Sequence, residues 1–193
     1  MTVDELRKVM RALKSDMRAT IEKTVKDGKE YGFVICNENG KIFKGPECHG
    51  DSCHIFDSTI KNCPTVSFFL SLDDGSLGFS GDKSPPFGLF HTHPVGPIEF
   101  GILMSPEDFV AGRFNKINCI GSASGNERKA RCYDMDMLSN SWRGASVNPM
   151  SSPGAPNVAH GSWEEWLLLP GEDFMNFQHD FVKKGRGVLT EVV

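Results

Sequence analysis

GLFHTHP at residues 88–94 and SPED at residues 105–108 are the two stretches of sequence that decide the fold and the chemistry expected of this chain. Residues 88–94 form a short apolar run that is typical of a buried β-strand entering a site. Alternate residues of a strand point to the same face of the sheet. His91 and His93 are therefore expected to direct their imidazole rings at one point.

A helix is predicted to begin at Ser105 and to run over residues 105–114. Serine is a favoured N-cap and proline a favoured first helical residue, and Asp108 then occupies the third helical position, as in a capping box. Such a cap fixes the direction in which the Asp108 carboxylate points. Zinc sites of hydrolases commonly use three histidine or carboxylate ligands and leave one position for water. His91, His93 and Asp108 are therefore the predicted zinc ligands.

Glu30 is the predicted general acid and base. It opens residues 30–36, EYGFVIC, a predicted buried strand in which Gly32 leaves room beside the carboxylate. Ser105 is expected to donate a hydrogen bond to the oxyanion of a tetrahedral intermediate. Each feature alone has a simpler explanation, namely a structural His-X-His pair, a helix N-terminus and a surface glutamate. Their combination in one chain favours a metal-dependent hydrolase.

The combination resembles the JAMM (also called MPN+ or JAB) metalloprotease family. The family pattern has a glutamate at the head of the first strand, then His-X-His-Pro and then Ser-X-X-Asp, here Glu30, residues 91–94 and residues 105–108. The resemblance covers roughly residues 15–138. It implies a cytidine-deaminase-like α/β (α+β) fold with a mixed, curved β-sheet flanked by helices. It also implies the same three Zn²⁺ ligands and the same roles for Glu30 and Ser105.

Members of this family cleave peptide or isopeptide bonds at the C-terminal tails of ubiquitin and related β-grasp proteins. The compact chain is more similar to prokaryotic and archaeal members than to subunits of large eukaryotic complexes. The resemblance implies a deubiquitinase-like metallo-isopeptidase acting on a ubiquitin-like or sulfur-carrier protein, whose extended tail would add a strand to a sheet edge.

One departure from the family pattern is a longer spacer, VGPIEFGILM at residues 95–104. This spacer and residues 139–162 are the candidate loops for gripping a substrate tail, although 139–162 is equally well explained as a connector.

Two other functions stay open. One is a hydrolase of short peptides or small amides, which predicts a narrow pocket and no affinity for a β-grasp protein. The other is a catalytically silent scaffold or binding module of the same fold. Such modules lack one or more metal ligands, whereas this chain has all of them. A zinc deaminase is disfavoured because the chain has no His-X-Glu with a downstream Pro-Cys-X-X-Cys.

The composition is that of an ordinary globular domain. The 193 residues suffice for one sizeable core, and 39% are hydrophobic and 24% charged. The formal net charge of −4 disfavours a general nucleic-acid binder. Residues 1–23 lack the apolar region of a secretory signal, and no apolar run is long enough for a membrane span. We therefore expect a cytoplasmic protein. Nothing in the sequence predicts its oligomeric state.

Apolar spacing predicts a first helix over residues 2–26, with a capping box of Thr2 and Glu5 and a stop at Gly28. Asn39-Gly40 predicts a hairpin turn. Further strands are predicted at residues 41–45, 65–72, 117–123 and 128–135, and a connection over residues 45–64.

We expect a catalytic core over residues 1–138 and a loop-rich C-terminal extension over residues 139–193 whose short helices pack on the same domain. Residues 139–162 are rich in Ser, Asn, Gly and Pro, a composition typical of a long loop. The following segment, residues 162–184, is predicted to be helical in two pieces, broken at Pro170-Gly171.

Several thiols and imidazoles lie close together in the predicted connection: Cys48, His49, Cys53, His54 and Cys63. Three explanations stay open for them, namely a structural zinc site, a disulfide such as Cys48–Cys53 or Cys53–Cys63, and reduced loop thiols.

The other cysteines, Cys36, Cys119 and Cys132, lie in predicted strands and are expected to pack in the core. His160 and His179 are expected to be surface or capping residues rather than ligands.

Overall fold

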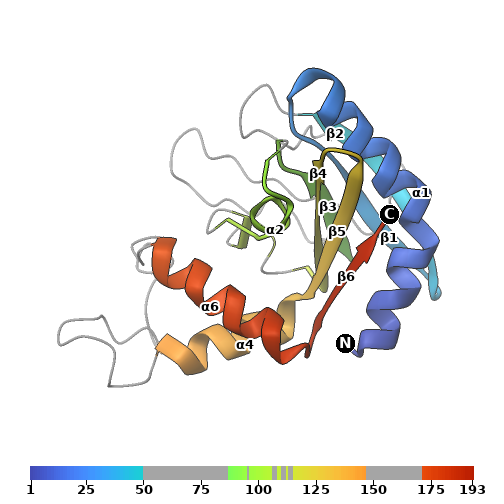
Figure 1. Ribbon diagram of the computed structural model, residues 1–193. Helices are drawn as coiled ribbons and strands as arrows, with labels where there is room; N and C mark the ends of the chain where they lie inside the picture. The colour runs from blue at the N-terminus through green and yellow to red at the C-terminus, as the bar shows by residue number, and fades with distance from the viewer. Residues whose placement is uncertain (50–86, 95, 106–107, 110–111, 113–114, 147–170) are drawn as a thin grey trace, which may run out of the picture.

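The computed structural model describes residues 1–49, 87–94, 96–105, 108–109, 112, 115–146 and 171–193. Over these residues the fold is a mixed α/β arrangement on one six-stranded sheet in the order β2-β1-β3-β4-β5-β6 (Figure 1). β3 and β4 run parallel, and every other neighbouring pair is antiparallel. The α/β class with a mixed sheet flanked by helices, expected from the sequence, is confirmed.

Helix α1 (Val3–Asp27) begins and ends where its sequence predicts. Thr2 Oγ1 accepts a hydrogen bond from Glu5 N–H at 3.2 Å, and Glu5 Oε2 accepts one from Thr2 N–H at 2.6 Å, which is the expected capping box. Gly28 ends the helix with φ of 74°, a left-handed conformation that glycine adopts without strain. The apolar side of α1 is buried against the sheet.

Strands β1 (Tyr31–Glu38) and β2 (Lys41–His49) form the predicted hairpin. Asn39 and Gly40 have φ of 52° and 84°, as a two-residue hairpin turn with both central residues at positive φ requires. β2 is longer than expected, because Tyr31 still pairs with His49. The connection predicted to start at residue 45 was therefore placed too early.

The other four strands are β3 (Gly88–Thr92), β4 (Ile117–Ser124), β5 (Glu127–Asp134) and β6 (Val188–Val192). The first three agree with the predicted strands to within a few residues. β6 was not predicted, because its five residues are too short for their alternation to stand out. It is an edge strand whose pairing with β5 brings the C-terminal residues into the same sheet.

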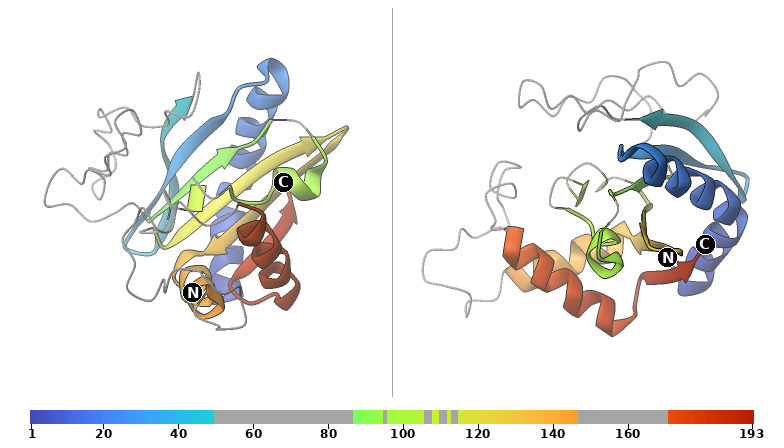
Figure 2. Two further views of the ribbon diagram at one scale, coloured as in Figure 1. Left: turned by 90° about the vertical axis from the view of Figure 1, so that its left-hand side faces the viewer. Right: turned by 45° about the horizontal axis from the view of Figure 1, so that its top comes forward.

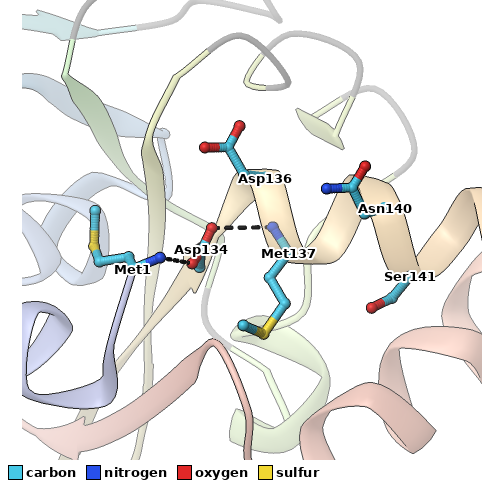
Figure 3. Close-up of a pocket in the computed structure, with 6 residues that line it drawn as sticks. All are labelled: Met1, Asp134, Asp136, Met137, Asn140 and Ser141. Atoms are coloured by element: carbon cyan, nitrogen blue, oxygen red, sulfur yellow. Dashed lines mark hydrogen bonds and ion pairs between the residues drawn. The ribbon is translucent and has the colours of Figure 1, made fainter.

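Helix α4 (Met135–Ser146) corrects the expectation of a loop from residue 139 onward. Asp134 starts this helix by accepting a hydrogen bond from Met137 N–H at 3.0 Å (Figure 3). Leu138 and Trp142, one turn apart, are both buried. The cap and this buried pair outweigh a composition that favours a loop. Asp134 also pairs with the N-terminal amine at the edge of an open pocket of about 430 Å³.

The spacer after the His-X-His-Pro segment is folded onto the sheet rather than free. It contains a short helix, α2 (Ile98–Gly101), whose Glu99 pairs with Lys129 of β5 at 3.2 Å. The next three residues, Ile102 to Met104, are fully buried. This part of the spacer is therefore a packing element. Phe100, in the same spacer, is 62% exposed. The expected role of residues 95–104 in gripping a substrate tail stays a prediction.

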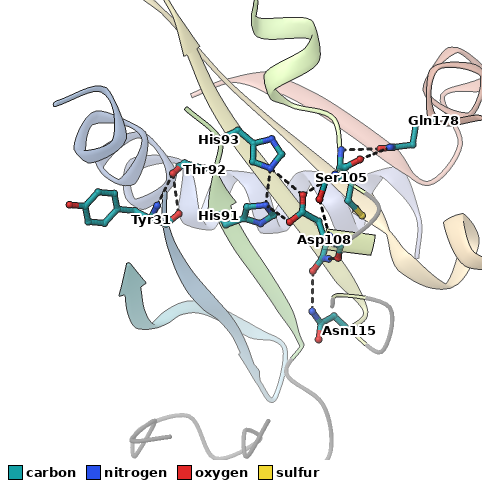
Figure 4. Close-up of polar contacts among 10 residues, drawn as sticks. Tyr31, His91, Thr92, His93, Ser105, Asp108, Asn115 and Gln178 are labelled. Carbon is teal, nitrogen blue, oxygen red and sulfur yellow. Dashed lines mark hydrogen bonds and ion pairs between the residues drawn. The ribbon is translucent and has the colours of Figure 1, made fainter. Parts of the chain in front are cut away.

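The sheet separates two cores (Figure 2). α1 covers one face. The opposite face is covered by α4, by α6 (Gly171–Lys184) and by the end of the spacer. α6 begins at Gly171, directly after residues that lie outside the described ranges, so the predicted break at Pro170-Gly171 stays a prediction. The histidines at residues 91 and 93 lie toward the second face, so the C-terminal helices share a layer with the candidate site (Figure 4).

Cys119 of β4 and Cys132 of β5 face each other in the ladder and form a disulfide. Both are completely buried in the core beneath α1. Cys36 is also disulfide-bonded. These cysteines were expected to pack in the core. Their burial is confirmed, and their disulfides were not predicted, because apolar strand context alone does not show that two cysteines face each other across a sheet.

Several expectations fall on residues outside the described ranges. They are the strand at 65–72, the helical piece before Pro170, the alternatives for Cys48, Cys53 and Cys63, and His160. Among the described helices, none combines the length and the apolar character that crossing a membrane demands.

Candidate metal centre

His91 is the fourth residue of β3, and His93 follows directly after the strand. The backbone of His93 is still held in strand geometry, because its N–H donates to Gly121 O of β4 at 3.0 Å. The two rings therefore lie on one face, as their i, i+2 spacing predicts. Their Nε2 atoms are 3.1 Å apart (Figure 4).

Gly32 of β1 makes room for this pair. It lies opposite His91 in the β1–β3 ladder. A Cβ atom at Gly32 would lie 2.7 Å from Phe90 O and 3.2 Å from His91 Cβ, which is closer than packed atoms tolerate. The glycine therefore allows β1 and β3 to approach closely at His91, and the room expected beside Glu30 stays a prediction.

Asp108 is oriented by the N-terminal cap predicted from the sequence. Ser105 Oγ accepts a hydrogen bond from Asp108 N–H at 3.0 Å, and Asp108 Oδ2 accepts one from Ser105 N–H at 2.8 Å. The reciprocal bonds fix both the main chain and the carboxylate of Asp108. Ser105 Oγ acts as an acceptor in this cap, so its own proton remains for donation to a further group.

The three side chains converge on one point. Asp108 Oδ1 lies 3.1 Å from His91 Nε2, and Asp108 Oδ2 lies 3.1 Å from His93 Nε2. In the described part of the chain, this is the one group of three or more His, Cys, Asp or Glu residues able to hold a metal ion. The three residues proposed as ligands from the sequence are thus brought together.

The geometry and chemistry of this group fit a small divalent cation. Ligand atoms of a tetrahedral zinc site, with bonds of about 2.0–2.1 Å, are about 3.3 Å apart. The 3.1 Å between the two Nε2 atoms is close to that value, and each histidine lies 3.1 Å from one oxygen of Asp108, His91 from Oδ1 and His93 from Oδ2. Two imidazole nitrogens and one carboxylate oxygen are also a donor set used by catalytic zinc. The structure therefore supports a metal-binding group, and its donor set is compatible with zinc.

Without a metal, the same group is an ionic pair. Burial opposes the charged form of Asp108, but His91 and then His93 outweigh it and hold the Asp108 pKa well below its usual 3.8. Burial also lowers the His91 pKa, yet Asp108 and, further away, Glu30 raise it above 6.5. A carboxylate that stays ionised is ready to bind a cation.

Glu30 lies at the head of β1, immediately before Tyr31, and is partly buried. Its carboxylate is near enough to contribute to the raised His91 pKa. Continuing the β1–β3 register by two residues from Gly32 and His91 places Glu30 on the same face as the histidines. The register therefore puts Glu30 on the face of the sheet that carries the metal-binding group.

Thr92 was missed by the sequence analysis, although it lies between the two histidines. It is fully buried on the opposite face. Its Oγ1 accepts a hydrogen bond from Tyr31 N–H at 3.0 Å and donates its own proton to Tyr31 O at 3.1 Å. The Thr92 hydroxyl also contacts the Thr24 hydroxyl of α1. Because the Thr92 proton is already used, Thr24 is the donor in that contact. Thr92 thus fixes the main chain beside Glu30.

Asn118 of β4 supports the turn that carries Asp108. Its Nδ2 donates to Asp108 O at 3.4 Å, and its Oδ1 accepts from Asn115 Nδ2 at 3.0 Å. Gly112 lies so close that a Cβ there would overlap the Asn118 amide at 1.5 Å. A buried asparagine within the apolar strand INCIGSA is the sequence signal that could have identified this residue.

Gln178 of α6 was also missed. Its side chain is completely buried and binds both main-chain groups of Met104, the residue before Ser105 (Figure 4). A polar residue on the apolar stripe of a helix, between Phe174 and Phe181, is the signal that could have found it. His179, the next residue, is partly buried and packs edge-on against Phe100, with ring centroids 6.2 Å apart.

Comparison with protein families, with curated proteins and with solved structures found no match for this chain. The grounds for a function are therefore the geometry and chemistry of the site itself.

Proposed function

We propose that this protein is a zinc-dependent hydrolase of peptide or isopeptide bonds. The observation that carries the proposal is the convergence of His91, His93 and Asp108, whose possible ligand atoms all lie within 4.8 Å of one another. Two imidazoles and one carboxylate bind catalytic zinc and also Fe(II), and zinc is proposed because the sequence pattern resembles that of the zinc-dependent JAMM family. A bound zinc ion would supply the Lewis acidity that activates water near neutral pH and polarises a carbonyl.

The chain's own groups then divide the remaining work. The two histidines and Asp108 hold the ion. Glu30, on the same face, takes the proton from the attacking water and delivers it to the leaving amine. The Ser105 hydroxyl, which accepts from Asp108 N–H, donates its proton toward the developing oxyanion.

The substrate class rests on the resemblance of the Glu, His-X-His-Pro and Ser-X-X-Asp pattern to the JAMM family. We propose on that basis a JAMM-type sheet, a ubiquitin-like or sulfur-carrier protein as substrate, and its C-terminal tail as the segment cleaved. A cytoplasmic location stays a prediction. The buried Cys119–Cys132 disulfide argues against it, since such bonds are rare in the cytosol outside hyperthermophiles.

Cleavage of a ubiquitin-like protein fused through its C-terminal tail to a reporter tests this function. We expect the zinc-loaded protein to release the reporter. Glu30→Gln should bind the same amount of zinc and lose at least about 100-fold in kcat/KM, the usual contribution of an acid–base group. Equal activity in Glu30→Gln would contradict its role. Cleavage of short peptides but not of the fusion would favour the small-substrate hydrolase, and zinc binding without any cleavage would favour a scaffold.

A further inference from the structure

The side chain of Gln178 holds the main chain of the segment that leads into the metal centre. Gln178 Oε1 accepts a hydrogen bond from Met104 N–H at 3.0 Å, and Gln178 Nε2 donates one to Met104 O at 2.6 Å. Gln178 and Met104 are both completely buried. The two bonds join α6 to a segment 74 residues earlier in the chain. Because both residues are shielded from bulk solvent, the two bonds lie in a low-dielectric environment that strengthens them.

This contact reaches Asp108 through one rigid unit. Met104 O and Ser105 N belong to the same peptide group, which is planar. Gln178 binds the oxygen of that group, and the N–H of the same group donates to Asp108 Oδ2 at 2.8 Å. The orientation of the Met104–Ser105 peptide therefore sets the direction of the hydrogen bond that aims the Asp108 carboxylate at the histidines.

We propose that Gln178 is a positioning residue of the metal centre. Because Gln178 belongs to α6, this helix is then a structural component of the centre. Gln178 acts through the Met104–Ser105 peptide and does not touch the metal. The proposal rests on the metal-binding role proposed above for the His91, His93 and Asp108 group. Groups that orient metal ligands typically contribute 10–100-fold to metal affinity.

A purely structural role would have a different signature. Gln178 lies among the aromatic residues of α6. If its role were purely structural, its loss would loosen the packing of α6 against the sheet and do nothing more. Such loosening should follow the loss of any buried side chain on that helix. Phe181 is on the same buried stripe, is 5% exposed, packs its ring against Phe177 and has no polar group that could bind the main chain of Met104. Phe181→Leu is therefore the matched control.

The test compares the full-length wild type, Gln178→Met and Phe181→Leu. Methionine has nearly the same length as glutamine and makes neither bond to Met104. The measurements are the Kd for Co²⁺ and Zn²⁺ against a chromophoric chelator, the visible spectrum of the Co²⁺ form, and hydrogen exchange at the Ser105 amide of the metal-free protein. We expect Gln178→Met to weaken both affinities about 10–100-fold, change the Co²⁺ spectrum and speed exchange at Ser105. Phe181→Leu should leave all three unchanged.

Unchanged affinity and spectrum in Gln178→Met would overturn the proposal, as would an equal loss in Phe181→Leu. If Gln178→Met does not fold, Gln178→Asn replaces it. This variant keeps the amide but is one methylene too short to make both bonds, and wild-type affinity in it would also overturn the proposal. If the wild-type protein binds neither Co²⁺ nor Zn²⁺, the proposed metal-dependent function is wrong, and this inference is overturned with it.

Discussion

Gly32 of β1 lies directly opposite His91 of β3, and the absent side chain of the glycine lets Phe90 O and His91 Cβ approach β1 closely. A methyl group at Gly32 would contact both Phe90 O and His91 Cβ at less than normal packing distance. The ligand geometry therefore depends on a residue that offers no ligand atom. This relationship gives a direct way to disturb the site without removing a donor.

We predict that Gly32→Ala weakens zinc binding at least about 10-fold, because His91 must move to admit the methyl group. The same overpacking should lower the free energy of unfolding by about 1–3 kcal/mol. Gly96→Ala is the control, since a Cβ at Gly96 meets nothing within 4 Å. Zinc titrations and urea unfolding measure the two effects. Wild-type affinity in Gly32→Ala would show that His91 tolerates the displacement.

Thr92→Val should separate catalysis from metal binding. Valine matches the shape of threonine but removes the hydroxyl that binds the main chain of Tyr31. Losing these two hydrogen bonds to the partly buried main chain of Tyr31 costs about 1–3 kcal/mol in the free energy of unfolding. Because Tyr31 follows Glu30, we expect kcat/KM to fall more than zinc affinity.

Thr20→Val provides the matched control for that substitution. Thr20 is equally buried on α1, but its hydroxyl donates only to Asp16 O within the helix. It should lose little stability and no activity. An equal loss of activity in both variants would contradict a specific role for Thr92.

The metal-free protein should lose stability as the pH rises above about 6.5. The His91 pKa is raised, so its contribution to stability is fully present below 6.5 and is lost as pH rises through the folded-state pKa. The Asp108 pKa is lowered, so its contribution is present above 3.8 and is lost only as pH falls far below that. Both contributions are complete between pH 3.8 and 6.5.

Urea unfolding in the presence of a chelator, at intervals from pH 5 to pH 9, measures this dependence. Asp108→Asn removes the carboxylate that raises the His91 pKa, so its stability should fall less steeply above pH 6.5. Parallel pH profiles for the wild type and Asp108→Asn would contradict the assignment.

The Cys119–Cys132 disulfide should stabilise the core beneath α1 by about 3 kcal/mol, the value typical of a loop of this length. Replacing both residues by alanine should lower the free energy of unfolding by about that amount and leave zinc affinity unchanged, since both side chains lie on the α1 face. Urea unfolding of the double variant under non-reducing conditions is the measurement. An unchanged midpoint would show that the cross-link contributes nothing.

Sequence patterns could predict the ligands because their geometry is local. His91 and His93 need only strand spacing, and the Ser105 cap needs only a four-residue motif. The supporting residues could not be placed in the same way. Thr92 acts on a residue 61 positions away, and Gln178 on one 74 positions away. Such contacts depend on how the layers pack.

The secondary-structure errors have similar causes. Residues 139–146 have the composition of a loop, yet the Asp134 cap and buried Trp142 make them helical. β6 is too short to be recognised from its sequence pattern. Its strand conformation depends on its pairing with β5. Local sequence could show that Cys119 and Cys132 are buried but not that they face each other.

Elemental analysis of metal content tests the central claim most directly, with wild type and His93→Ala purified without added metal. His93 supplies one of the three ligand atoms, so its loss should abolish metal binding. It is less buried than His91, so the variant should still fold. We predict that each wild-type chain holds one tightly bound zinc ion and that His93→Ala holds none. No zinc in the wild type, even after reconstitution, would contradict it, as would the same zinc content in both proteins.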